Sequence, residues 1–279
     1  MSVIQELFVV EDFQILPRAQ PLLIRLFRPL GAGPFPIVIN LHGGAWTKGD
    51  LTECRPRDEA IASAGIASAA LDFRHGEDAY PTSLEDVNFA VRWVKNNAEM
   101  LKVDRSRVGL VGQSSGGHLA MLAAMRPDDP RYAATALEGD NDASVVCVAM
   151  TWPVINPLSR YRHALRLRDS RDPPAWTHDI PARHDIYWKT ESNMEEGNPL
   201  LALERGESLQ TPPALWIQGT PDLIHDYRDP TSALNANEPE RFATRYREAG
   251  GTIELVYIDQ EGRADHSLAP LTRFLGERL

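Results

Sequence analysis

Short apolar runs alternate with amphipathic segments along most of the chain. Apolar runs bounded by turn residues predict strands at 22–27, 36–41, 65–72, 107–112, 145–152, 213–218 and 253–258. Helical patterns, in which apolar residues recur every three or four positions, occur at 83–94, 117–125, 238–249 and 268–279. Strands that alternate with helices predict an α/β fold with a mostly parallel central sheet flanked by helices.

One segment, 156–209, is too long for a simple connection between two strands. It carries a group of basic residues followed by aromatic ones: Arg160, Arg162, Arg166, Arg168, Arg171, Trp176, Tyr187 and Trp188. One interpretation is a solvated amphipathic helix and loop. The other is a lid over a pocket at the carboxyl edge of the sheet, where open α/β sheets bind ligands. We expect a single domain over 1–279, with 156–209 as a lid insertion.

Composition narrows the class of protein. Of 279 residues, 43% are hydrophobic and 24% are charged, which is typical of a globular protein and excludes disorder. The formal net charge of −10 argues against nucleic acid or an anionic membrane as a partner. Cys54 and Cys147 lack metal-site spacing, residues 1–12 have no basic leader pattern, and no apolar run is long enough to span a bilayer. These features predict a cytoplasmic protein.

The most informative motif is the pentapeptide Gly-Gln-Ser-Ser-Gly at 112–116. It directly follows a predicted strand and directly precedes a predicted helix, which is the setting of a nucleophile elbow. Glycine two residues to either side of Ser114 lets the strand and helix pack closely. Ser114 is therefore the candidate nucleophile. Ser115 is the competing hydroxyl, but it occupies the position where a backbone N–H is needed.

A second motif, His-Gly-Gly-Ala-Trp at 42–46, follows the predicted strand at 36–41. A tetrahedral intermediate carries an oxyanion, which needs preorganised N–H donors. A glycine-rich loop can turn its amides toward one point, and such a loop lies beside the elbow in esterases and lipases.

Together these motifs resemble the α/β-hydrolase fold, and within it the hormone-sensitive-lipase-like carboxylesterases, acetyl esterases and arylformamidases. The resemblance extends from about Pro36 to the C-terminus and is weakest across 156–209. It implies oxyanion donors at the amides of Gly44, Ala45 and Ser115. Ala45 replaces the family's third loop glycine but keeps its N–H.

The triad needs a histidine base and an acid, in the chain order Ser, Asp or Glu, His. His266 lies in a polar loop after the last predicted strand, where the family keeps its catalytic histidine, and is the expected base. His225 is among the histidines that no strand-end setting marks as the base. Asp222 is the expected acid because it follows the strand at 213–218 in a Gly-x-x-Asp pattern, with Asp226 and Asp229 as alternatives.

These residues predict a serine carboxylesterase that needs no cofactor and no metal. The expected partner is a small-molecule ester or amide, and a homodimer stays open. Trp46 and Trp152 are expected to bind substrate and to favour short acyl groups. An amidase or arylformamidase would use the same triad, and a non-catalytic ligand-binding protein on this fold is a third hypothesis.

Overall fold

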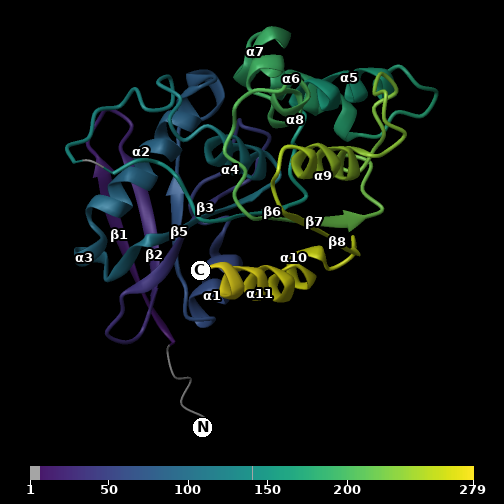
Figure 1. The fold of residues 1–279 in the computed structure, drawn as a ribbon. Coiled ribbons are helices and arrows are strands. Elements are labelled where there is room, and N and C mark those ends of the chain that lie inside the picture. The colour runs from purple at the N-terminus through teal and green to yellow at the C-terminus, as the bar shows by residue number, and fades with distance from the viewer. Residues whose placement is uncertain (1–6, 140) are drawn as a thin grey trace.

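A computed structural model describes residues 7–139 and 141–279. Its centre is a mixed sheet with the strand order β1-β2-β4-β3-β5-β6-β7-β8 (Figure 1). The strands are β1 (Phe8–Leu16), β2 (Leu22–Pro29), β3 (Phe35–Leu41), β4 (Ala67–Asp72), β5 (Val103–Gln113), β6 (Val148–Thr151), β7 (Ala214–Thr220) and β8 (Ile253–Asp259). The pairs from β4 to β8 are all parallel, so the carboxyl ends of these strands meet at one edge. The predicted α/β class with a mostly parallel sheet is confirmed.

The sequence patterns did not indicate β1. This edge strand is antiparallel to β2, and it interrupts its apolar residues with acidic ones. Arg25 of β2 pairs with Asp12 at 2.7 Å, and Arg28 pairs with Glu11 at 2.9 Å. The strand therefore lacks the alternation of apolar and polar residues that would have predicted it, and ion pairs to β2 help to hold it in the sheet.

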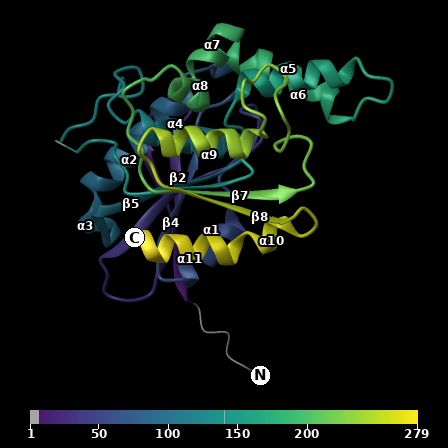
Figure 2. The same cartoon turned by 45° about the vertical axis from the view of Figure 1, so that its right-hand side comes forward.

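Helices cover both faces of the sheet (Figure 2). One face carries α1 (Arg55–Ser63), the short α10 (Arg263–His266) and α11 (Leu268–Arg278), which enclose a core that includes Val38, Val111 and Leu215. The other face carries α2 (Thr82–Asn96), α3 (Ala98–Leu101), α4 (Ser115–Met125) and α9 (Glu238–Glu248). A single turn, η1 (Gly76–Asp78), precedes α2. Because both faces are covered, the central strands are mainly apolar, and their buried polar residues include Asn40 and Ser68.

The segment 156–209 forms four consecutive helices between β6 and β7. They are α5 (Pro157–Arg168), α6 (Trp176–Trp188), α7 (Glu191–Glu196) and α8 (Pro199–Glu204). Helix α5 begins with a proline in its first turn. The side chain of Asn156 caps it by accepting a hydrogen bond from the Ser159 amide at 3.0 Å. Figure 1 shows these helices gathered together on one side of the sheet.

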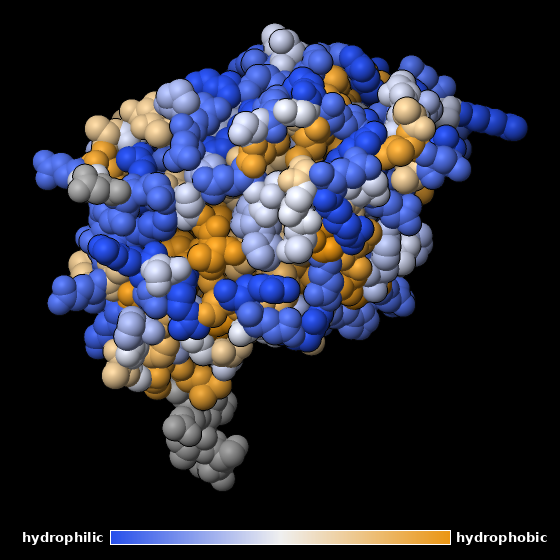
Figure 3. Space-filling view, viewed as in Figure 1, coloured by the Kyte–Doolittle hydropathy of each residue, from blue (hydrophilic) through white to orange (hydrophobic). Residues whose placement is uncertain are grey.

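No helix in the described ranges is long and apolar enough to cross a membrane. The face shown in Figure 3 is mainly hydrophilic, with hydrophobic side chains in patches between charged ones. Residues 1–6, which carry half of the segment considered for a leader pattern, lie outside the described residues.

Candidate active site

Ser114 sits on a sharp turn between β5 and α4. Its backbone has φ 52° and ψ −116°, a combination that side-chain-bearing residues rarely adopt. The turn is so tight that a Cβ on Gly112 would lie 2.2 Å from the carbonyl oxygen of Gly116. A Cβ on Gly116 would lie 2.3 Å from the carbonyl oxygen of His42. Both glycines are therefore required sterically, and the predicted elbow geometry is present at Ser114.

The loop after β3 packs directly against this elbow. A Cβ on Gly43 would lie 3.6 Å from the Cβ of Ser114. The loop holds positive φ angles at Gly44, Ala45 and Trp46, of 102°, 52° and 60°. Two consecutive non-glycine residues in this region are strained, and such strain is typical of functional loops.

The expected oxyanion donors have unused N–H groups. The amides of Gly44, Ala45 and Ser115 donate no hydrogen bond to any residue that the structure describes. Ser115 is the first residue of α4, so its N–H lies at the positive end of the helix dipole. Amides of this kind are available to an oxygen atom bound beside Ser114.

The hydroxyl of Ser114 contacts His225, and His225 contacts Asp222. Ser114 Oγ lies 3.1 Å from His225 Nε2, and His225 Nδ1 lies 2.8 Å from Asp222 Oδ2. Both partners come from the loop after β7, only three residues apart. The other carboxylate oxygen of Asp222 accepts the amides of Ile224 and His225 at 2.9 and 3.2 Å, which forms a tight Asx turn. Because of this turn, the imidazole of His225 lies against the carboxylate of Asp222.

The histidine beside Ser114 is therefore His225, which corrects the expectation for His266. His266 ends the short helix α10, is exposed, and packs its ring over the backbone of Gly262. The residue of α10 that reaches the acid is Arg263, whose Nη1 lies 2.9 Å from Asp222 Oδ2. The sequence signal for His225 is its place three residues after Asp222 in the loop that follows β7, and this signal alone does not favour it over His266.

The structure also separates Asp222 from the alternative acids. Asp226 accepts a hydrogen bond from the side chain of Asn237 at 2.6 Å. Asp229 accepts from Thr231 at 2.8 Å and lies 3.4 Å from Arg241. Of these acids, Asp222 is the one that contacts the imidazole.

The charges of the site favour a neutral imidazole beside an ionised carboxylate. Burial alone would raise the pKa of Asp222, but hydrogen bonding to His225 and the nearby positive charge of Arg263 bring it down to about 2. Burial lowers the pKa of His225 and outweighs the opposite effect of Asp222, and the charges of Arg160 and Arg263 lower it further. A neutral imidazole can accept a proton from Ser114.

The two expected substrate-binding indoles are buried in the protein. Trp46 is 1% exposed, and its ring packs against His118, His184, Tyr187 and Trp188 beneath the helical insertion. Trp152 is 3% exposed, and the guanidinium of Arg263 lies 4.3 Å from the centre of its ring. These contacts support the oxyanion loop and the strand end, and they leave little of either indole exposed for contact with a substrate.

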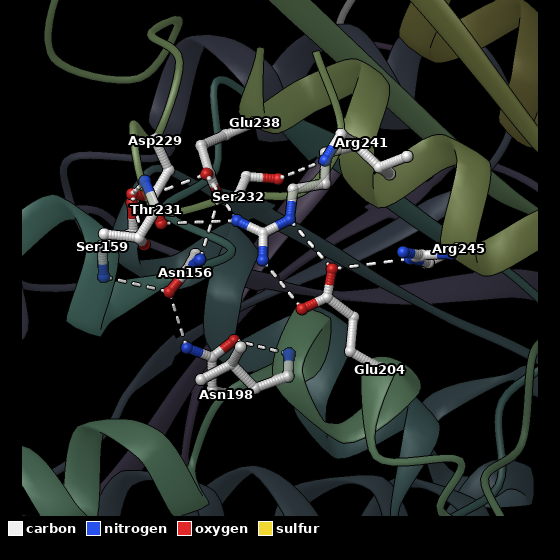
Figure 4. Close-up of polar contacts among 12 residues, drawn as sticks. Asn156, Ser159, Asn198, Glu204, Asp229, Thr231, Ser232, Glu238, Arg241 and Arg245 are labelled. Carbon is white, nitrogen blue, oxygen red and sulfur yellow. Dashed lines mark hydrogen bonds and ion pairs between the residues drawn. The ribbon is translucent and has the colours of Figure 1, made fainter. Parts of the chain in front are cut away.

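A polar network ties the loop after β7 (residues 221–237, here called the triad loop) to the insertion (Figure 4). Glu238, at the start of α9, accepts a hydrogen bond from Asn156 at 3.0 Å, and Asn156 also accepts one from Asn198 at 2.7 Å. Arg241 joins Glu238 to Glu204 on α8 through contacts of 3.2 and 2.7 Å. The amide of Glu238 donates to the carbonyl of Tyr227 at 2.9 Å. The loop that bears Asp222 and His225 is thus anchored at its far end.

Within residues 7–139 and 141–279, no group of three or more His, Cys, Asp or Glu side chains is arranged to hold a metal ion. The His and Asp side chains at 178–185 have other partners, since Asp179 pairs with Arg183 at 2.6 Å and His184 bonds the Ile180 carbonyl at 2.8 Å.

Comparison with protein families gives a match to the BD-FAE family over residues 26–169, which is more than half of the chain. This chain belongs to the BD-FAE family. The matched range includes the nucleophile elbow and the oxyanion loop, and it stops within α5. The part of the chain that supplies Asp222 and His225 lies outside the BD-FAE match.

Curated relatives of this BD-FAE chain are esterases by name. The probable carboxylic ester hydrolase LipM of Mycobacterium tuberculosis is 34% identical over 102 residues, which cover 36% of this chain and 24% of LipM. The carboxylic ester hydrolase LipN of the same organism is 32% identical over 257 residues, covering 89% of this chain and 62% of LipN. The chain thus spans less than two thirds of the length of either relative.

Solved structures show the same fold. An esterase of Pyrobaculum calidifontis superposes with a TM-score of 0.73 at 21% identity, covering 96% of this chain and 84% of that one. The thermostable carboxylesterase EstE1, cloned from a metagenomic library, gives 0.76 at 21% identity, covering 99% and 91%. With the family match, these results confirm the predicted α/β-hydrolase fold and the predicted relationship to carboxylesterases.

Proposed function

We propose that this protein is a serine hydrolase that cleaves carboxylic esters of small, short-acyl or aromatic substrates through an acyl-enzyme. The observation that carries the proposal is the chain of contacts from Ser114 through His225 to Asp222, beside three unused amides. The names of the curated relatives favour esters over amides. The presence of a nucleophile, a base and an acid in contact argues against a purely ligand-binding role.

Each residue has a defined task in this mechanism. Ser114 Oγ attacks the acyl carbon while its proton passes to His225 Nε2. The carbonyl oxygen becomes an oxyanion, which the amides of Gly44, Ala45 and Ser115 stabilise. His225 then gives the proton to the departing alkoxide, leaving an acyl group on Ser114. Asp222 holds the imidazole tautomer and stabilises the imidazolium throughout.

Hydrolysis of the acyl-enzyme repeats these steps with water as the nucleophile. His225 takes a proton from water, hydroxide adds to the acyl carbon, and the proton returns to Ser114 Oγ as the carboxylic acid leaves. No cofactor is needed for any of these steps. We propose that the four-helix insertion serves as a lid, because Ala45 of the oxyanion loop packs against Ala164 of α5 and Ile180 of α6.

The nucleophile assignment is tested with p-nitrophenyl acetate and a fluorophosphonate label. Ser114→Ala should remove nearly all turnover and all labelling, since it deletes the attacking oxygen. Ser115→Ala keeps its backbone amide and should still be labelled. Labelling that survives in Ser114→Ala and disappears in Ser115→Ala would show that the elbow serine has been misassigned.

Substrate class is tested with a panel of p-nitrophenyl acetate, butyrate and decanoate, an aryl amide, and an N-formyl aromatic amine. We expect acetyl and butyryl esters to give the highest kcat/KM, because Ala164 of α5 and Ile180 of α6 pack against Ala45 of the oxyanion loop and would crowd a long acyl chain. A preference for decanoate would contradict the short-acyl proposal. A preference for the formyl amine would identify an arylformamidase instead.

A further inference from the structure

Arg160 is the one arginine of the basic segment at 160–171 that the fold buries. It is 2% exposed, whereas Arg162, Arg166, Arg168 and Arg171 are all exposed. Its guanidinium lies 5.1 Å from the centre of the Trp46 ring, which holds it against the indole that backs the oxyanion loop. Arg160 therefore belongs to the interior beneath the insertion.

The guanidinium of Arg160 has no counterion among the residues that the structure describes. Its Nε and Nη2 atoms are buried and have no hydrogen-bond partner there. The neighbouring carboxylates are occupied by other groups: Asp222 by His225 and Arg263, and Glu238 by Asn156 and Arg241. A buried charge without a partner costs several kcal/mol, so native proteins pair such groups with an anion.

The place for that anion is the small cavity that Arg160 shares with His225. Its wall also includes Asn156, Ile224, Tyr227 and Glu238. A volume of about 10 Å³ holds roughly one water molecule, so it admits one oxygen atom of a carboxylate whose remaining atoms lie outside it. The imidazole that forms part of this wall is hydrogen-bonded through Nε2 to the nucleophile. A group bound here would therefore lie against the imidazole that contacts Ser114, although Ser114 itself is not part of the cavity wall.

We propose that Arg160 binds a carboxylate carried by the substrate, so that this enzyme prefers acidic esters to neutral esters of the same shape. The inference rests on the proposed ester hydrolysis and names the substrate class of the same site. Arginine is suited to the task, because its planar group offers paired donors to a carboxylate.

The test uses substrate pairs that differ only in charge. Phenyl hydrogen succinate and phenyl succinamate place the carboxylate or its neutral amide on the acyl side, and 3-acetoxybenzoate and 3-acetoxybenzamide place it on the leaving group. After subtraction of the uncatalysed rate, we expect the acid to exceed the amide in kcat/KM by about 10- to 100-fold in at least one pair. Equal rates within both pairs would overturn the proposal.

Variants of α5 assign the preference to one residue. In Arg160→Gln the acid-to-amide ratio should fall to near one, and Arg160→Lys should retain part of it. Arg162→Gln is the matched control, since Arg162 lies on the same helix, is about half exposed and pairs with Glu191 at the surface. A ratio that survives in Arg160→Gln, or that falls equally in Arg162→Gln, would also overturn the proposal.

Two further measurements separate this proposal from ester hydrolysis itself. Failure of the unaltered enzyme to cleave any ester, acidic or neutral, would remove the proposed function without overturning the role of Arg160. In that case calorimetry with the Ser114→Ala variant still tests Arg160, because succinate should bind it at least tenfold more tightly than succinamide. If Arg160→Gln fails to fold, two measurements still test the proposal: the binding of succinate against succinamide by Ser114→Ala, and the acid-to-amide ratio of kcat/KM in Arg160→Lys. The absence of any carboxylate preference in both would overturn the proposal and would mean that the cavity holds only water.

Discussion

Replacing His225 is the most decisive perturbation, because it separates the expectation from sequence from the arrangement in the structure. His225→Gln removes the only imidazole that contacts Ser114 in the described part of the chain. The variant keeps a polar side chain of similar size, so Asp222 retains a hydrogen-bond donor and the loop retains its Asx turn. His266→Gln is the matched control, since His266 is exposed and lies on a different loop.

The expected magnitude follows from the task that each imidazole performs. A positioned general base contributes about 10²–10⁴-fold to a rate, and in the proposed mechanism His225 acts in both acylation and deacylation. We expect kcat to fall about 10³–10⁴-fold in His225→Gln, which is about 4–5.5 kcal/mol of transition-state stabilisation. His266→Gln should lose less than about threefold, as is usual for an exposed side chain outside the site.

Both variants should be assayed with p-nitrophenyl acetate under single-turnover conditions, with circular dichroism to confirm folding. Single-turnover conditions report acylation directly and avoid a change of the rate-limiting step. A thousandfold loss in His266→Gln together with near-normal turnover in His225→Gln would refute the assignment. That outcome would mean that the loop after β8, and not the turn after Asp222, delivers the base.

Two further predictions address the geometry and charge of the same site. Gly116→Ala should lower the free energy of unfolding by about 1–3 kcal/mol and cut turnover more than tenfold, because the new Cβ would lie 2.3 Å from the His42 carbonyl oxygen. Urea denaturation measures the loss of stability. The control is Gly276→Ala, whose Cβ meets open space and should change neither stability nor turnover. Arg263→Gln removes a positive charge that lowers the pKa of His225, so the pKa should rise and the acid limb of the kcat/KM profile should move to higher pH. Arg273→Gln, at an exposed ion pair with Glu254, should leave that limb in place, and an unmoved limb in Arg263→Gln would show that its charge does not act on the base.

Local sequence was sufficient for the features that depend on neighbouring residues. The elbow at Ser114 and the loop at 42–46 each combine a buried strand, glycines and a turn within a few positions, and both have the expected backbone geometry. Asp222 could be selected because it closely follows the end of β7. These features rest on steric limits and chain direction, which a short window of sequence contains.

The partner of Ser114 could not be selected in the same way. The family resemblance favoured His266, because the usual place for the base is the loop after the last strand. The structure instead turns the chain at Asp222, so that a histidine three residues later folds back onto its acid. Which of two loops reaches a serine depends on tertiary packing, and a pattern of residue types carries little information about it.

The insertion shows the same limit for Arg160. Five arginines within twelve positions look like one basic surface, but helical geometry sends only the first of them inward. The burial of Trp46 and Trp152 was not foreseen for a related reason, since a large indole beside a glycine-rich loop or a strand end can face the core instead of a pocket. Which side of a loop is buried becomes clear only when the covering helices are in place.

Helix α5 of the insertion contacts both loops that flank Ser114. Arg160, His163 and Ala164 are spaced by three and four residues, so they share one face of this helix. Ala164 packs on Ala45 of the oxyanion loop, while His163 stacks on Tyr227 of the triad loop at 4.0 Å between ring centres. Arg160 lines the cavity beside His225. This one helix therefore contacts both the loop of the proposed oxyanion donors and the loop of the proposed base, and substitutions on its inner face should alter kcat even where they do not touch substrate.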